Sequence, residues 1–144
     1  PLAFAIAALL GTDDMTGPDV WARQLVTISA PAWAYFTVTD RLGGRSIGKR
    51  LLGLATRAGD DAAPGSTAAI TRTAMKLLPW ELVHIAFFAM SASFERVDAV
   101  QLVVAGASYV LMLAYLVVAL RNGGTRSIPD LVAGTRVQPV GAAV

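Results

Sequence analysis

Between residues 41 and 54 the chain reads Arg41-Leu-Gly-Gly-Arg-Ser-Ile-Gly-Lys-Arg-Leu-Leu-Gly-Leu54. Four of the twelve basic residues lie in this segment, and a long apolar stretch lies on either side of it. Basic residues beside apolar helices are typical of loops on the cytoplasmic side of a membrane. The segment therefore predicts both the class of protein and the orientation of its helices.

The composition supports a membrane protein. The chain has 144 residues, of which 55% are hydrophobic and only 15% are charged. Soluble domains carry roughly 25% charged residues, so this chain lacks the charge that a water-exposed surface requires. It contains no cysteine, which excludes disulfides and cysteine-ligated metals. We expect a single all-α membrane domain over residues 1–144.

Four apolar segments predict transmembrane helices, at about residues 1–10, 20–39, 68–92 and 99–120. The fourth is the clearest, because it has no charged residue and is long enough to cross a bilayer. The first is too short, so we interpret it as the outer half of a helix whose beginning precedes residue 1. The third begins with an amphipathic turn that suits the lipid headgroup region.

The distribution of charge predicts the orientation. Residues 11–19 and 91–98 together hold five acidic residues and one basic residue, whereas ten of the twelve basic residues belong to the opposite side. By the positive-inside rule, residues 40–67 and 121–144 are cytoplasmic. We therefore expect a multi-pass protein of a bacterial cytoplasmic membrane with both termini in the cytoplasm.

Short elements are predicted in the two cytoplasmic segments. Residues 46–52 suit an interfacial helix that places Arg45, Lys49 and Arg50 at lipid headgroups. In the tail, Ser127 and Asp130 have the spacing of a capping box, and Gly134 ends the short helix that follows. Residues 135–140 are predicted to form a strand that pairs with residues 52–57. Asp130 is expected to face Arg45 or Arg50.

We expect no nucleotide site at residues 43–49, although they match the pattern Gly-x-x-x-x-Gly-Lys of phosphate-binding loops. That pattern continues with Ser or Thr as a magnesium ligand, and Arg50 stands there instead. The preceding element is a predicted membrane helix rather than a strand. The basic residues at helix ends likewise indicate membrane anchoring rather than nucleic-acid binding.

Glu81 and His84 share one face of the third predicted helix, three residues apart. Ionisable residues inside a membrane are costly and are functional candidates for that reason. One reading makes the pair a proton or cation relay with Asp40 or Asp130 nearby. The other has Glu81 pair with Arg41, Arg45 or Arg121 while a neutral His84 packs between helices. One His and one Glu are too few ligands for a metal site.

Residues 44–54, Gly59, Arg72 and the stretch Asp130-Leu-Val-Ala-Gly-Thr-Arg-Val137 resemble the RDD family of small bacterial membrane proteins. The resemblance covers about residues 20–138, and its motif positions are Gly44, Ser46, Gly48, Lys49, Arg50, Gly53, Asp130, Gly134 and Thr135. It implies that Asp130 is the family's second aspartate, while the defining arginine and first aspartate belong to the first helix, which is cut short here. Pro129 stands where the family often has histidine, which argues against proton transfer at Asp130.

Two functions follow as expectations. The first is a non-catalytic accessory or interaction module that packs against membrane lipids, other membrane subunits or a second copy of itself. The alternative is a small cation/proton transporter that uses Glu81 and His84, because the resemblance implies a link of some members to cation/proton antiport. In neither case do we expect enzymatic activity, a cofactor or a nucleotide.

Overall fold

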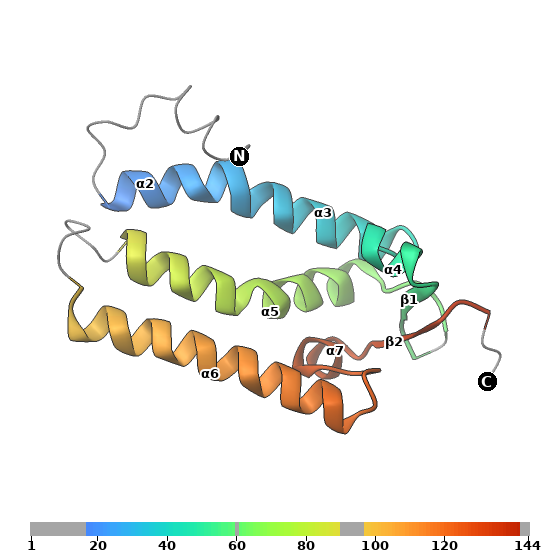
Figure 1. The fold of residues 1–144 in the computed structure, drawn as a ribbon. Helices are drawn as coiled ribbons and strands as arrows, with labels where there is room; N and C mark the ends of the chain where they lie inside the picture. The colour runs from blue at the N-terminus through green and yellow to red at the C-terminus, as the bar shows by residue number, and fades with distance from the viewer. Residues whose placement is uncertain (1–16, 60, 90–96, 142–144) are drawn as a thin grey trace. The chain divides into compact units, whose positions relative to one another are not determined.

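A computed structural model describes residues 17–59, 61–89 and 97–141 (Figure 1). Within these residues the chain forms two compact units. The first contains residues up to 32 and residues 78–110, and the second contains residues 33–77 and 111 onward. The predicted span at 1–10, most of the acidic loop at 11–19 and most of the loop at 91–98 lie outside the described residues.

Helices dominate the fold. The long ones are α2 (Gly17–Gln24), continued by the π-helix η1 (Leu25–Ser29) and α3 (Ala30–Arg41); α5 (Ser66–His84), continued by the π-helix η2 (Ile85–Ala89); and α6 (Ala99–Arg121). The short elements are α4 (Ile47–Leu51), β1 (Leu54–Arg57), α7 (Ile128–Ala133) and β2 (Arg136–Pro139). The second, third and fourth apolar segments of the sequence therefore form the long helices.

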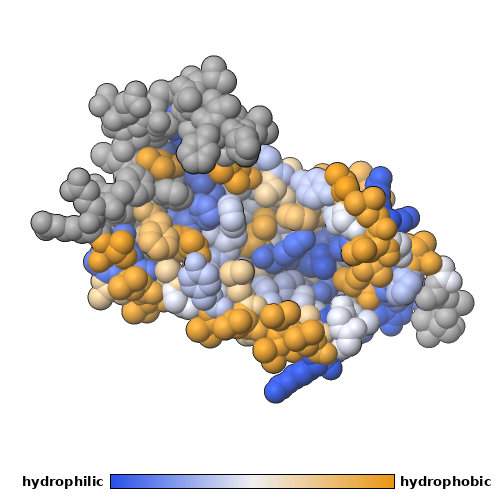
Figure 2. Space-filling view, viewed as in Figure 1, coloured by the Kyte–Doolittle hydropathy of each residue, from blue (hydrophilic) through white to orange (hydrophobic). Residues whose placement is uncertain are grey.

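Among the described residues, α6 is the one helix that is both long and apolar enough to cross a membrane. An 18-residue window of α6 has a mean hydropathy of 2.3, and only 11% of that window is buried. Large apolar side chains stand outward along it, including Val103, Val110 and Leu120. Figure 2 shows hydrophobic residues along the lower edge of the view, where α6 lies. Such an exposed apolar face suits lipid or another membrane protein.

The buried face of α6 in the first unit is polar. Gln101 and Ser108 are almost fully buried there, with Ala105 between them. Gln101 Nε2 donates to the carbonyl of Ala86 at 3.0 Å, and the Ser108 hydroxyl donates to the carbonyl of Pro79. Small and polar residues at this spacing share one helix face and allow close helix packing through hydrogen bonds. The polar groups of this apolar helix therefore serve its packing.

Pro79 lies inside α5, and the helical hydrogen bond that it removes is replaced by one in the second unit. Proline has no N–H, so the carbonyl of Met75, four residues earlier, loses its helical donor. The Tyr115 hydroxyl of α6 donates to this carbonyl at 2.7 Å. The side chain of a neighbouring helix thus satisfies a backbone group that the proline leaves unpaired.

The two strands of the second unit form an antiparallel pair in which Leu54 lies opposite Pro139 and Arg57 opposite Arg136. The predicted pairing of residues 52–57 with residues 135–140 is therefore confirmed over Leu54–Arg57 and Arg136–Pro139. Gly44 lies against β1: its carbonyl accepts from the Thr56 N–H at 2.7 Å, and its φ is +70°. A Cβ at this position would collide with the Thr56 carbonyl oxygen, so only glycine fits.

Candidate functional site

Five side chains of the second unit form a buried charge cluster, and each comes from a different element. They are Asp40 at the end of α3, Lys49 on α4, Thr56 on β1, Arg72 on α5 and Asp130 on α7. Burying charges in a small domain is costly unless they are paired and hydrogen-bonded. The cluster is therefore the feature whose geometry most constrains what this part of the chain does.

Arg72 lies at the centre of the cluster. Its Nη1 lies 2.6 Å from Asp40 Oδ2, and its Nε lies 2.7 Å from Asp130 Oδ1. The exposed fractions of the three side chains are 7%, 1% and 3%. The planar guanidinium can direct separate N–H groups at two carboxylates, which a lysine ammonium cannot do with the same rigidity. Arg72 thereby connects α5 to both α3 and α7.

Lys49 completes the coordination of Asp40. Its ammonium lies 2.8 Å from Asp40 Oδ1 and donates a second hydrogen bond to the Thr56 hydroxyl. The Thr56 hydroxyl in turn donates to Asp40 Oδ1 at 3.4 Å. Asp40 therefore binds two cations and a hydroxyl from three separate elements.

The position of Lys49 corrects the prediction that it contacts lipid headgroups. Its side chain is only 14% exposed, because the buried carboxylate of Asp40 attracts it inward. On the opposite face of α4, Ile47 and Leu51 are 64% and 82% exposed. Arg50 is exposed and donates from Nε to the Arg45 carbonyl at 3.3 Å. The headgroup role of Arg45 and Arg50 stays a prediction.

Asp130 uses both of its carboxylate oxygens. Oδ2 accepts from the Ser127 backbone N–H at 3.1 Å and from the Ser127 hydroxyl at 2.6 Å. Oδ1 accepts from the Thr135 hydroxyl at 3.1 Å in addition to Arg72. The predicted capping box is present, and α7 ends at Gly134 in the left-handed conformation, as predicted. The predicted cationic partner was wrong: it is Arg72 rather than Arg45 or Arg50.

The electrostatics of the cluster keep both carboxylates ionised. Burial alone would raise the pKa of Asp40, but the charge of Arg72 and the hydrogen bond from Lys49 outweigh it and lower the pKa. For Asp130, burial is likewise outweighed by the charge and hydrogen bond of Arg72 and by Ser127, so its pKa is lowered. A general acid or base works best when its pKa lies near the working pH. Neither carboxylate is suited to exchange protons near neutral pH.

For Lys49, burial outweighs the hydrogen bond and the charge of its partner in setting the pKa. Burial and the neighbouring charge of Arg72 lower the pKa of its ammonium, while the hydrogen bond and the charge of Asp40 oppose that shift. The net charge of the cluster is zero, because two cations face two carboxylates.

Lys76, one turn after Arg72 on α5, does not belong to the cluster. Its ammonium lies 3.3 Å from the centroid of the Phe36 ring.

Glu81 and His84 lie on α5 in the first unit. His84 Nδ1 lies 2.7 Å from the carbonyl oxygen of Trp80, one turn earlier, and the two rings are 4.1 Å apart. A carbonyl only accepts hydrogen bonds, so Nδ1 carries the proton in this contact. Asp40 and Asp130, either of which the relay reading names as a neighbour, are both bound to Arg72. The roles of Glu81 and His84 stay predictions.

Three other motif positions lie before, inside and after α4 in the second unit. Ser46 precedes α4 as its N-cap residue, Gly48 lies inside α4, and Gly53 has a φ of +65° between α4 and β1. Among residues 17–59, 61–89 and 97–141, no group of three or more His, Asp or Glu side chains is placed to hold a metal ion. Lys49, which the phosphate-loop pattern would use, is bound to Asp40.

Sequence reasoning missed that Asp40, Thr56 and Arg72 belong to one site. The sequence pattern identifies Arg72 only as a motif position and Asp40 only as a neighbour of a relay. One signal was present: Asp40 ends an apolar helix, and a carboxylate there needs a partner. Nothing in the spacing indicates which of the ten basic residues on that side provides it.

A mostly helical chain with a membrane-length apolar helix exposed on its surface and its charges paired in the interior is typical of a membrane-associated protein. The family comparison narrows this class. The model of the RDD family matches residues 2–134, and the chain belongs to the RDD family. No curated protein and no solved structure matches the chain.

Proposed function

We propose that this protein is a multi-pass component of the bacterial cytoplasmic membrane that acts as a non-catalytic accessory or interaction module. In this proposal its four spans bring both termini to the cytoplasmic side, and its helices pack against other membrane subunits or against lipid. The exposed apolar face of α6 carries the proposal, because a surface of this kind requires a hydrocarbon or protein neighbour.

The charge cluster supports a structural role. Its carboxylates and cations are paired with one another, and both carboxylates have lowered pKa values. Active sites hold groups whose pKa is moved toward the working pH, whereas the pKa values of Asp40 and Asp130 are moved away from it. We interpret the cluster as a clamp that joins α3, α4, β1, α5 and α7 at the cytoplasmic end of the helices.

The rival function is a cation/proton transporter. It is supported by the two ionisable residues Glu81 and His84, which lie on one helix within the predicted third span. A four-helix chain encloses a polar pathway only as an oligomer, so the transporter requires self-association. Flux through the membrane is the property that separates it from the interaction module.

The test is reconstitution of the full chain into proton-tight vesicles. The interaction module predicts no proton-coupled sodium or potassium flux above that of empty vesicles. The transporter would be the correct function if the original chain shows flux, if Glu81→Gln abolishes it and if the surface variant Asp61→Asn retains it. That result would contradict the interaction module. In native membranes, a photo-crosslinker at the exposed Leu113 should yield a discrete adduct, whereas one at the buried Gln101 should not.

The topology has a separate test. Because the chain lacks cysteine, Asp14→Cys and Arg45→Cys each introduce a single thiol. A membrane-impermeant reagent applied to intact cells should label position 14 and not position 45. Labelling of both, or of neither until the cells are opened, would contradict the proposed orientation.

A further inference from the structure

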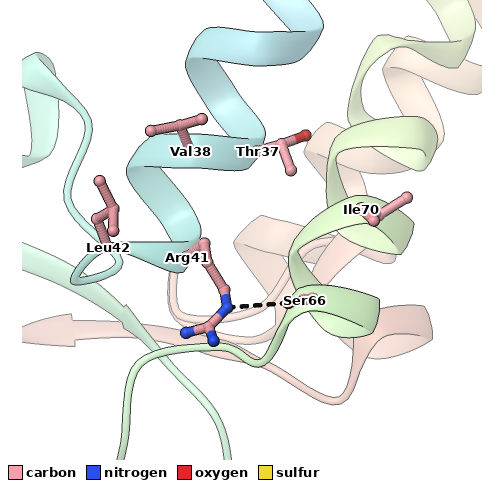
Figure 3. A pocket seen from close by; sticks show the side chains of 6 residues that line it. All are labelled: Thr37, Val38, Arg41, Leu42, Ser66 and Ile70. Atoms are coloured by element: carbon pink, nitrogen blue, oxygen red, sulfur yellow. Dashed lines mark hydrogen bonds between the residues drawn. The ribbon is translucent and has the colours of Figure 1, made fainter.

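A small apolar groove lies where α3 ends and α5 begins in the second unit (Figure 3). It has a volume of about 270 Å³. Its lining residues are Thr37, Val38, Arg41, Leu42, Ser66 and Ile70. The exposed fractions of Val38, Leu42 and Ile70 are 49%, 78% and 52%. Three exposed aliphatic side chains thus surround an open hollow on the surface of the second unit.

A cation stands in the wall of this groove. Arg41 Nε donates to the Ser66 hydroxyl at 3.0 Å, as the dashed line in Figure 3 shows. Among residues 17–59, 61–89 and 97–141 the terminal nitrogens of Arg41 have no hydrogen-bond acceptor. The hydrogen bond to Ser66 holds the guanidinium beside the groove, and Arg41 is exposed.

No carboxylate described in the second unit neutralises Arg41. Asp40 is bound by Lys49 and Arg72, Asp130 by Arg72, and Asp61 by Arg136. A second cation lies close by, because Arg57 Nη1 donates to the carbonyl of Gly43 at 3.4 Å, two residues from Arg41. Because Arg41 and Arg57 are both cationic, a ligand at this end of the groove should be an anion.

We propose that the groove binds one anionic phospholipid, with its phosphate on Arg41 and the upper part of one acyl chain against Val38, Leu42 and Ile70. The inference rests on the proposed membrane function, and it names the lipid class that the module contacts. A hydrocarbon chain matches the aliphatic lining, and a net negative headgroup matches the unneutralised guanidinium. A soluble phosphate compound would leave the aliphatic wall in water, and a zwitterionic lipid lacks the net charge.

The experiment measures lipid binding to the full-length chain in detergent by native mass spectrometry. Phosphatidylglycerol is titrated against phosphatidylcholine with matched acyl chains. We expect phosphatidylglycerol to bind about fivefold more tightly, since one basic residue at a membrane surface contributes about that factor. Arg41→Gln should remove this preference and leave phosphatidylcholine binding unchanged, and Arg41→Lys should restore part of it.

The groove itself is tested by Ile70→Trp, which fills it, and by Ile70→Ala, which removes part of its wall; both should weaken binding of the two lipids. The matched control is Arg121→Gln, because Arg121 is an exposed base of the same unit outside the groove. Equal losses in Arg41→Gln and Arg121→Gln would overturn the site. So would unchanged binding in both Ile70 variants, or displacement of the lipid by millimolar inorganic phosphate.

These outcomes are separable from those of the proposed function. A protein that inserts with positions 14 and 45 on opposite sides but shows no preference for phosphatidylglycerol overturns this inference alone. A protein with ion flux or with the reverse topology contradicts the proposed function whatever its lipid preference.

Discussion

Arg72 and Asp130 are 58 residues apart in the chain, and their side chains meet at 2.7 Å in the interior of the second unit. The contact connects α5 to the short helix α7 and so ties the C-terminal tail to a long helix. The same guanidinium also binds Asp40 at 2.6 Å. One side chain thus determines how three elements meet, and several predictions start from it.

Removing either partner of the Arg72–Asp130 pair should destabilise the second unit strongly. Asp130→Asn leaves the buried cluster with one cation in excess, and Arg72→Met leaves Asp130 without its cation. An uncompensated buried charge costs about 3–5 kcal/mol. Unfolding of the full chain in mild detergent, followed by circular dichroism, measures this loss. The double variant should lose less than the sum of the two single losses, and strict additivity would show that the pair does not interact.

Lys49 and Arg50 are adjacent on α4 and should respond differently to substitution. Lys49→Ala removes a cation and a hydrogen-bond donor from the buried Asp40, so we expect a loss of about 1.5–3 kcal/mol in the free energy of unfolding. Arg50→Ala is the matched control and should stay within about 0.5 kcal/mol of the original chain. Equal effects would mean that Lys49 is not held in the cluster.

The pH dependence of stability follows from the lowered pKa values of Asp40 and Asp130. In the unfolded chain an aspartate titrates near pH ~3.9. Above about pH 5 both states are ionised, so these groups cause no change in stability between pH 5 and 8. Below that, the unfolded chain takes up protons before the folded one does, and stability falls as the pH approaches the lower folded pKa.

The measurement is the unfolding midpoint from pH 8 to pH 3 in a non-ionic detergent. Asp40→Asn should lower the unfolding midpoint between pH 5 and pH 8. It should also make the fall of the midpoint below pH 5 less steep. A profile of unchanged steepness in that variant would assign the acid sensitivity to other groups.

Three glycines form a graded series. Gly44→Ala places a Cβ against the Thr56 carbonyl at a φ of +70°, so the backbone must shift, and we expect a loss above about 2 kcal/mol. Gly53→Ala has only the strain of a φ of +65°, which costs about 1–2 kcal/mol. Gly48→Ala lies inside α4 with open space around it and should stabilise the helix by up to about 1 kcal/mol. Thermal unfolding checks the order.

Tyr115 and Pro79 should be energetically coupled. Tyr115→Phe leaves the Met75 carbonyl without a donor, at a cost of about 1–3 kcal/mol. Pro79→Ala restores the missing backbone N–H, so Tyr115→Phe should cost less in that background. A double-mutant cycle measures the difference, and a coupling energy of zero would contradict the compensation described for this proline.

The sequence by itself predicts the long apolar helix, the two strands and the limits of the short helix α7. The uncharged stretch at 99–120 is α6, because an apolar run of that length is typical of a helix that can cross a bilayer. The segments predicted as strands, residues 52–57 and 135–140, contain β1 and β2, and Ser127, Asp130 and Gly134 delimit α7. These elements could be predicted because caps and strand propensities act over a few residues.

Tertiary structure decided the partners. Lys49 turns inward and Arg72 binds two carboxylates because ion pairing depends on how helices from distant parts of the chain approach one another. All the basic residues on that side carry the same charge, so composition and spacing alone do not distinguish the one that reaches Asp130. The packing of the helices determines which cation pairs with Asp130. A carboxylate removed from water is stable only beside the cation that the packing brings within hydrogen-bond distance.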